Sequence, residues 1–134
     1  MTASLTSTGS TAAVIVTHQR AELLRASLEQ VVHQTHPVQW VVVVDNGAED
    51  AVRELVESMA GDRGVYVPSE TNLGGAGGFA LGFLTALSLG ADAVWCADDD
   101  GRPADHAVLA ELYRVAEANR LHEVSPAVCN IDDP

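Results

Sequence analysis

Three consecutive aspartates, Asp98, Asp99 and Asp100, follow the apolar residues 93–97 and precede Gly101. Carboxylates about 4 Å apart repel each other by roughly 4 kcal/mol at an effective dielectric constant near 20. Three of them at the end of a buried strand therefore require a nearby cation, or their pKa values must rise. Oxygen ligands favour Mg²⁺ or Mn²⁺ over Zn²⁺, and Mg²⁺ is commonly shared between one or two carboxylates and the phosphates of a substrate. The alternative to a metal site is that the three aspartates form a solvated acidic turn.

Apolar runs and helical periodicities alternate along the chain, which indicates an α/β fold. Short apolar runs predict strands, and apolar residues three or four positions apart predict helices. The expected strands are residues 13–16, 40–44, 64–67 and 93–97, with a fifth possible at 123–129, and the expected helices are 24–32, 52–59, 79–89 and 108–115. Pro126 would confine the fifth strand to an edge or a bulge. This order predicts a mostly parallel, doubly wound, Rossmann-like sheet of about five strands.

Polar or glycine-rich segments follow each of the first four expected strands. They are residues 17–20, 45–46, 72–78 and 98–100. Ligands of doubly wound sheets bind beyond the carboxyl ends of the strands, so this common position favours a functional site over a solvated turn. Two of these residues could instead have a purely local role: Asp45 begins an Asp-Asn-Gly turn, and Arg20 could be a solvated residue at a helix start. An arginine at this edge would offer planar donors to a phosphate or a base.

The glycine-rich segment also contains a second motif. Gly75-x-Gly77-x-x-Ala80 matches the dinucleotide-binding fingerprint, lies between an expected strand and helix, and is followed by an acidic residue, Asp98. A NAD-type dinucleotide-binding domain is therefore an alternative. Against it, the fingerprint belongs after the first strand of such a unit, whereas this one follows the third, and two of the three aspartates would have no role. The glycines could equally serve close packing of a helix on the sheet.

The composition narrows the class of protein. The 134 residues suffice for about one domain with a core, and 47% of them are hydrophobic. A net charge of −12, from 19 acidic and 7 basic residues, disfavours a nucleic-acid partner. A phosphorylated small molecule is compatible with this acidity where a metal ion and helix N-termini mediate the contact. The 5 histidines lack the spacing of a helical metal site, and the 2 cysteines form no metal motif.

The N-terminal segment, residues 1–11, is rich in serine and threonine and lacks the basic start of a signal peptide. The apolar runs, such as residues 40–44, are too short to span a bilayer. We therefore expect residues 1–11 to form a disordered leader and the protein to be cytoplasmic.

Five segments together resemble the nucleotide-sugar-binding half of inverting family 2 glycosyltransferases, which have the GT-A fold. The segments are Val-Thr-His-Gln-Arg (16–20), Val-Val-Val-Asp-Asn (42–46), Asn-Leu-Gly-Gly-Ala-Gly-Gly-Phe-Ala (72–80), Ala-Asp-Asp-Asp-Gly (97–101) and Val-Ser-Pro-Ala-Val-Cys-Asn-Ile-Asp-Asp-Pro (124–134). The glycine loop combined with three aspartates is the most specific feature. The resemblance is greatest to the galactofuranosyltransferases that start the galactan of mycobacterial-type cell walls, and it spans residues 12–134.

The resemblance implies a metal-dependent, inverting enzyme that transfers galactofuranose from UDP-galactofuranose to a sugar acceptor linked to polyprenyl diphosphate. Residues 12–134 would be the nucleotide-sugar-binding portion of its GT-A domain. Within this portion, the resemblance implies that Thr17, Arg20 and Asp45 contact the uridine end of the donor. A non-catalytic fragment that binds a nucleotide-sugar is an alternative.

The resemblance also implies a metal site and a pocket wall. Asp98 and Asp100 would hold Mn²⁺ or Mg²⁺ across the diphosphate, and Asp99 would face the sugar. The ion would neutralise the leaving UDP as a Lewis acid. The loop residues that border the nucleotide-sugar pocket would be Asn72, Gly74 and Gly75.

Members of the family continue beyond the length of this chain, into a half that supplies the catalytic base and the acceptor site. An inverting transfer needs a base to deprotonate the acceptor hydroxyl. No residue here matches that base, so we expect it beyond residue 134 and expect the sheet to be incomplete at its C-terminal side. Because a polyprenyl-linked acceptor would lie in lipid, peripheral association with the inner face of the plasma membrane is a further expectation.

Overall fold

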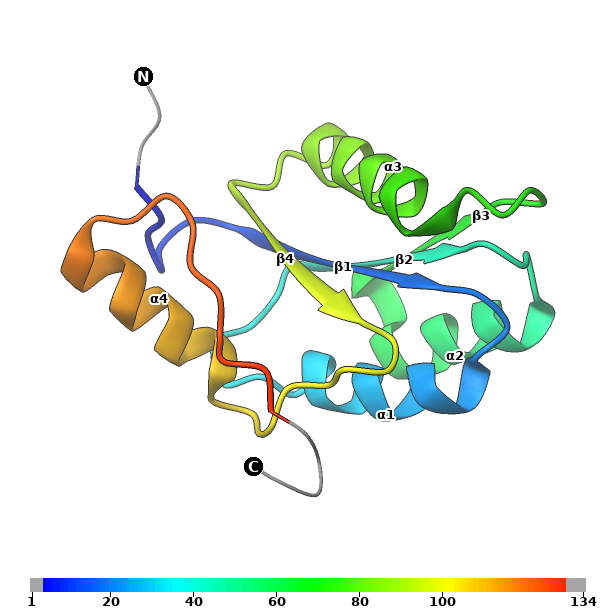
Figure 1. Cartoon of the computed structure of the whole chain (residues 1–134), viewed down its shortest axis with the longest axis horizontal. Coiled ribbons are helices and arrows are strands. Elements are labelled where there is room, and N and C mark those ends of the chain that lie inside the picture. The colour runs from blue at the N-terminus through cyan, green and yellow to red at the C-terminus, as the bar shows by residue number, and fades with distance from the viewer. Residues whose placement is uncertain (1–3, 130–134) are drawn as a thin grey trace.

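A parallel sheet of four strands forms the middle layer of the structure, a computed structural model that describes residues 4–129 (Figure 1). The sheet order is β3-β2-β1-β4, and the strands are β1 (Thr11–Thr17), β2 (Trp40–Asp45), β3 (Gly64–Pro68) and β4 (Ala93–Asp98). The helices are α1 (Ala21–Val32), α2 (Asp50–Ala60), α3 (Gly74–Ser88) and α4 (Val108–Asn119), with a 3₁₀ turn, η1 (Gly61–Arg63), after α2. The predicted α/β fold with a parallel sheet is confirmed.

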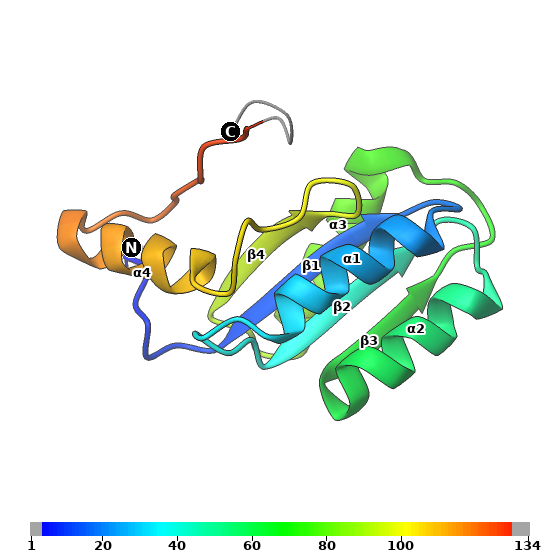
Figure 2. The same ribbon diagram turned by 90° about the horizontal axis from the view of Figure 1, so that it is seen from below.

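Helices cover both faces of the sheet, with α1 and α2 on one side and α3 on the other (Figures 1 and 2). Successive side chains of a strand point to opposite faces. Accordingly, Ala13 and Ile15 of β1 pack in the cluster formed with α1, α2 and α4, whereas Ala12 and Val14 pack in the cluster beneath α3. All four side chains are fully buried. Burial on both faces explains the continuous apolar runs of β1 and β2. The strand expected to be buried before the aspartates, β4, is instead largely half-buried or exposed, because it lies at the edge of the sheet.

The segment at residues 123–129, where a fifth strand was possible, is irregular in the structure. Pro126 has no N–H to donate to a ladder, which disfavours strand pairing there. In the part of the chain that the structure describes, β4 pairs only with β1 and is therefore the edge of the sheet.

The N-terminal segment differs from the disordered leader expected for residues 1–11. Leu5 packs against the main core cluster, and the last residue of the expected leader already belongs to β1. The N–H and the hydroxyl of Ser7 donate to Oε1 of Glu117 on α4, at 2.6 and 2.7 Å. A composition rich in small polar residues gave no sign of this order, because the acceptors of their donors lie far away in the sequence, at Glu117 and at Asp92. Residues 1–3 lie outside the described residues.

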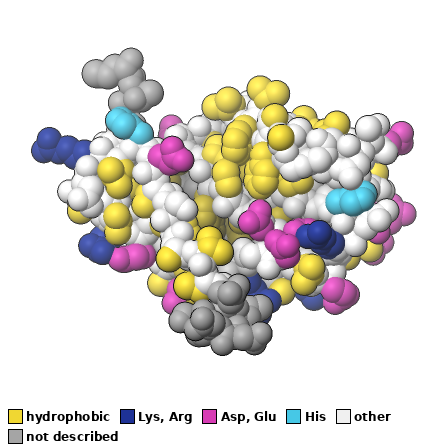
Figure 3. All heavy atoms as spheres, in the orientation of Figure 1, with side chains coloured by type: hydrophobic (Ala, Val, Ile, Leu, Met, Phe, Trp, Pro, Cys, Tyr) yellow, Lys and Arg dark blue, Asp and Glu magenta, His cyan; other side chains and the backbone are white. Residues whose placement is uncertain are grey.

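The outward face of α3 is apolar and exposed. Its exposed large side chains are Phe83, Leu84 and Leu87, and apolar atoms gather over this helix in Figure 3. The helix has 15 residues. Among residues 4–129, no helix is both long enough and apolar enough to cross a membrane.

Two glycines let α3 lie close to β1. A Cβ added at Gly78 would come within 2.6 Å of Cγ1 of Val16, and one added at Gly82 would overlap Cγ1 of Val14. Val14 is fully buried and has no room to move away. At Gly75, by contrast, an added Cβ would meet nothing within 4 Å. Close packing on β1 therefore explains Gly78 and Gly82 but not Gly75.

We expect the substitution Gly82→Ala to lower the free energy of unfolding by about 1–3 kcal/mol, because it overpacks the contact between α3 and β1. Urea denaturation followed by circular dichroism measures this change. The matched control is Gly75→Ala, which adds the same methyl group in open space and should be neutral or stabilising by up to about 1 kcal/mol. Equal losses in the two variants would contradict the assignment of Gly82 to helix packing.

Candidate functional site

The register of the sheet brings the ends of three strands to one edge. Thr17 of β1 is the partner of Asp45 at the end of β2. On the other side of β1, Asp98 at the end of β4 is the partner of Val16. Because the strands are parallel, their carboxyl ends share this edge, where ligands of such sheets bind. The structure therefore places these polar strand ends together, as the sequence predicts.

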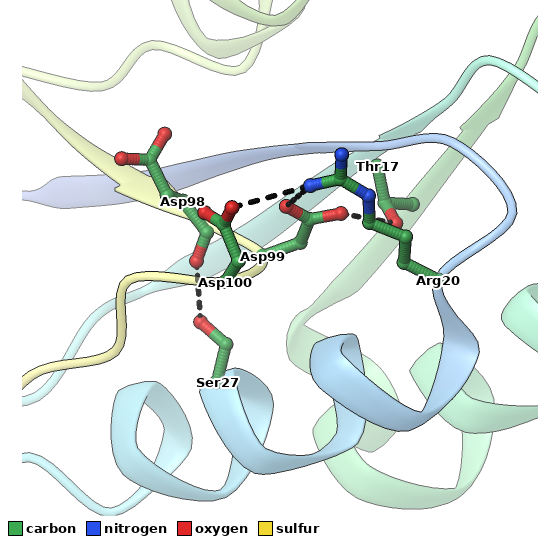
Figure 4. Close-up of polar contacts among 6 residues, drawn as sticks. All are labelled: Thr17, Arg20, Ser27, Asp98, Asp99 and Asp100. Carbon is green, nitrogen blue, oxygen red and sulfur yellow. Dashed lines mark hydrogen bonds and ion pairs between the residues drawn. The ribbon is translucent and has the colours of Figure 1, made fainter. Parts of the chain in front are cut away.

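Asp99 lies against the end of β1 and is held by two side chains. Oγ1 of Thr17 donates to Oδ2 of Asp99 at 3.0 Å. Nη1 of Arg20 lies 3.5 Å from Oδ1 of Asp99 and 3.2 Å from Oδ2 of Asp100 (Figure 4). The side chain of Asp99 is only 9% exposed, whereas that of Asp100 is 57% exposed. The guanidinium thus supplies the positive charge that two neighbouring carboxylates require.

Asp98 differs from its two neighbours. Its carboxylate is exposed and points away from those of Asp99 and Asp100 (Figure 4). Its backbone carbonyl accepts a hydrogen bond of 2.8 Å from the buried hydroxyl of Ser27, which ties the end of β4 to α1. The three aspartates therefore have three different environments, although they are adjacent in the sequence.

The described residues contain no group of three or more His, Cys, Asp or Glu side chains that could hold a metal ion. The exposed carboxylates of Asp98 and Asp100 nevertheless have the ligand chemistry that Mg²⁺ and Mn²⁺ prefer. An ion of this kind is usually completed by the phosphates of a substrate and by water, and needs only one or two protein carboxylates. Their ligand chemistry therefore fits an ion that is shared with a diphosphate. Because the two carboxylates point in different directions here, the assignment of Asp98 and Asp100 to one ion stays a prediction.

Asp45 is fully buried and organises the turn that leads into α2. Its carboxylate accepts hydrogen bonds from the N–H of Gly47 at 3.0 Å, the N–H of Glu49 at 2.7 Å and the hydroxyl of Tyr66 at 2.7 Å. Burial and, next, the hydrogen bond to Asp45 raise the pKa of Tyr66 well above its usual value. These bonds give Asp45 a structural role in the turn, as one interpretation of the sequence predicts. The contact of Asp45 with uridine stays a prediction.

The glycine loop is attached to the end of β2 by Asn46. The side-chain amide of Asn46 donates to the carbonyl of Gly74 at 3.2 Å, and its oxygen accepts from the N–H of Leu73 at 3.2 Å. Within the loop, Oδ1 of Asn72 accepts from the N–H of Gly74 at 2.9 Å. Gly74 has a φ of +72°, which favours glycine. The loop and the end of β2 therefore form one unit.

The predicted site residues thus fall into two groups at one edge. In the first group, Thr17 contacts Asp99 and Arg20 contacts Asp100. In the second group, Asn46 joins the end of β2 to the glycine loop. Sequence reasoning did not select two residues that hold these groups, Ser27 and Tyr66, and it included Asn46 in a polar segment without giving it a role. Ser27 interrupts an apolar helix face and Asn46 follows Asp45 directly, so both left a signal in the sequence.

The fold is similar to that of solved GT-A glycosyltransferases. The mannosyltransferase PcManGT from Pyrobaculum calidifontis, in complex with GDP-Man and Mn²⁺, superposes with a TM-score of 0.59 at 24% identity, over 81% of this chain and 33% of that chain. TarS 1–349 of S. aureus, in complex with UDP, superposes with a TM-score of 0.63 at 22% identity, over 81% of this chain and 32% of that chain. At these identities the likeness concerns the fold alone.

Residues 12–133 match the profile of Glycosyl transferase family 2, and the chain belongs to this family. It is 54% identical over 130 residues to galactofuranosyltransferase GlfT1 of Mycolicibacterium smegmatis, covering 97% of this chain and 43% of that protein. It is also 54% identical over 129 residues to GlfT1 of Mycobacterium tuberculosis, covering 95% of this chain and 42% of that protein. The chain thus spans about two fifths of the length of these relatives. Family membership confirms the resemblance and disfavours the dinucleotide-binding alternative.

We expect the substitution Tyr66→Phe to lower the free energy of unfolding by about 1–3 kcal/mol, because the buried carboxylate of Asp45 loses a donor. The raised pKa of Tyr66 adds a pH dependence: above a pH of about 10 the unfolded phenol ionises while the folded one keeps its proton, so stability falls as pH rises. Urea denaturation at pH 7 and at pH values above 10 measures both effects.

Tyr113→Phe is the matched control for this hydroxyl. The hydroxyl of Tyr113 bonds to the neutral Oγ1 of Thr11, so its loss should cost only about 0.5–1.5 kcal/mol. A loss in Tyr66→Phe no larger than that in Tyr113→Phe, with the alkaline decline unchanged, would refute the role assigned to Tyr66.

Proposed function

We propose that the chain is the donor-binding part of a metal-dependent, inverting galactofuranosyltransferase, which transfers galactofuranose from UDP-galactofuranose to a lipid-linked sugar acceptor. The observation that carries this proposal is the 54% identity to two galactofuranosyltransferases over almost the whole chain. The geometry supports it, because the acidic triplet, Thr17 and Arg20 meet at the edge of the sheet where such folds bind ligands.

The residues near β1 and β4 have the chemistry to bind the diphosphate of the donor. Arg20, for which the resemblance implies a contact with the uridine end, also offers planar guanidinium donors, which suit phosphate oxygens. Asp98 and Asp100 would hold Mn²⁺ or Mg²⁺, and the ion would supply positive charge to the departing UDP. The buried Asp99 is fixed by Thr17, so its remaining role would be to orient the sugar and Arg20. The Mn²⁺ in the complex of PcManGT supports this choice of metal.

The second group of residues would surround the nucleotide. Asp45 gives the turn after β2 a fixed shape, and Asn72 does the same for the glycine loop. A Cβ added at Gly75 would meet nothing within 4 Å, so a ligand can approach the backbone there. TarS 1–349, which has a similar fold, is in complex with UDP, and this supports a uridine nucleotide here.

Transfer to the acceptor also requires a base that deprotonates its hydroxyl, a role that we assign to none of the site residues above. We infer that the catalytic base lies beyond residue 134, in the part that the longer galactofuranosyltransferases have in addition. An acceptor linked to polyprenyl diphosphate would lie in a membrane, so the complete enzyme would work in the cytoplasm at the inner face of the plasma membrane. If the chain acts alone, it would be a non-catalytic nucleotide-sugar-binding fragment.

We expect the chain to bind UDP only when Mn²⁺ or Mg²⁺ is present, because the ion must offset the repulsion between the diphosphate and the aspartates. Isothermal titration calorimetry should show this binding, and the gain in UDP affinity that the metal causes should be lost in Asp98→Ala and in Asp100→Ala. Asp62→Ala, which removes an exposed carboxylate from η1, is the control and should bind like the unmodified chain. UDP binding of equal strength with and without metal in all variants would count against the proposal.

We expect residues 1–134 alone to transfer no sugar from UDP-galactofuranose, because the acceptor hydroxyl would lack a base. The measurement is a transfer assay with a disaccharide acceptor, run beside a binding assay for the donor on the same sample. Binding without transfer is the expected result. Transfer by the chain alone would show that its base lies within these 134 residues.

A further inference from the structure

Arg20 is bound to the acidic triplet through a single nitrogen. Nη1 contacts Asp99 at 3.5 Å and Asp100 at 3.2 Å (Figure 4). A guanidinium has five N–H groups on three nitrogens, so Nη2 and Nε keep donors that these two contacts do not use. The arginine therefore neutralises carboxylates while it still has donors for another anion.

The two contacts of Arg20 differ in how easily they can break. Asp99 has a 9% exposed side chain and is anchored by Thr17, so its carboxylate has a fixed position. The pair with Asp100 joins side chains that are 51% and 57% exposed, and exposed ion pairs of this kind are weak. A divalent cation carries twice the charge of the guanidinium and can replace it at Asp100.

We propose that Arg20 is an internal counter-ion that is exchanged during donor binding. Without a divalent ion it holds Asp99 and Asp100, and an ion that binds Asp100 displaces it from that carboxylate. The freed guanidinium then donates to the diphosphate of the nucleotide, with Asp99 as its remaining partner. This inference rests on the proposed donor binding, and it makes Arg20 a positioning residue that couples the metal site to the nucleotide site.

The proposal gives Arg20 opposite effects on the two ligands. Arg20 competes with a divalent ion for Asp100, so its removal should strengthen binding of the ion alone. It also supplies hydrogen bonds to the diphosphate, so its removal should weaken binding of the nucleotide. A residue that only stabilised the loop would weaken both when it is removed.

The first test is Arg20→Gln in the full chain, with Mn²⁺ and UDP as probes. Free Mn²⁺, measured by electron paramagnetic resonance without nucleotide, should show binding tighter by a factor of about two to five, the contribution typical of an exposed ion pair. Calorimetry at saturating Mn²⁺ should show UDP binding weaker by a factor of about ten or more, as expected for a lost charge-assisted hydrogen bond. Circular dichroism confirms that the variant is folded.

Two further variants separate charge from geometry. Arg20→Lys keeps the positive charge, so its affinity for Mn²⁺ alone should stay close to that of the unmodified chain. Arg25→Gln removes an exposed positive charge elsewhere on α1 and controls for the change in net charge. It should leave both affinities within a factor of about two, because exposed charges are screened by salt and solvent.

A substitution of Asp100, the carboxylate that pairs with Arg20, also tests the exchange. Asp100→Asn releases Arg20 without any metal, so UDP binding measured in the presence of a chelator should become detectably tighter than in the unmodified chain. The same measurement on the double variant Arg20→Gln with Asp100→Asn should show that this gain is lost. Together these results would establish that Asp100 restrains Arg20.

Weaker Mn²⁺ binding in Arg20→Gln, or unchanged metal-free UDP binding in Asp100→Asn, would overturn the exchange. These outcomes differ from a failure of the proposed function. If the unmodified chain bound no UDP with Mn²⁺, donor binding itself would be refuted and the exchange with it. If it bound UDP with Mn²⁺ while Arg20→Gln left the affinity for Mn²⁺ unchanged, only the exchange would be refuted.

Discussion

The charge balance at the carboxyl edge of the sheet is the constraint on which the rest of the site depends. Three adjacent carboxylates at the end of β4 cannot share one environment without strong repulsion. The structure gives each of them a different one: Asp98 points away into solvent, Asp99 is buried against Thr17 and Arg20, and Asp100 is exposed beside Arg20. One half-exposed guanidinium therefore balances two carboxylates.

The position of this edge follows from the central strand. β1 is paired on one side with β2 and on the other with β4, so its own end at Thr17 lies between the polar ends of both neighbours. The close approach of α3 to β1, which Gly78 and Gly82 permit, keeps the glycine loop near the same end. Packing of apolar residues thus determines where the polar groups meet, because the strand register leaves them no other edge.

Buried and partly buried polar residues connect this packed core to the site. Ser27 ties the end of β4 to α1, Tyr66 ties Asp45 to β3, and Asn46 ties the glycine loop to β2. Each satisfies a polar group that would be costly to bury without a partner. Such contacts fix the turns and loops in shape, so a nucleotide would meet a surface that is already formed on one side and adjustable at Arg20 and Asp100 on the other.

The sequence by itself determined the alternation of strands and helices, the parallel sheet, and the presence of the acidic triplet and the glycine loop at strand ends. These features are local, since periodicity and turn residues act over a few positions. Only the tertiary structure decided that Arg20 pairs with Asp99, 79 positions away, that Asp98 points elsewhere, and that Ser7 binds Glu117 across 110 positions. It also left residues 123–129 outside the sheet. Side-chain direction and partners depend on register and packing between distant segments, and no local pattern of residues encodes them.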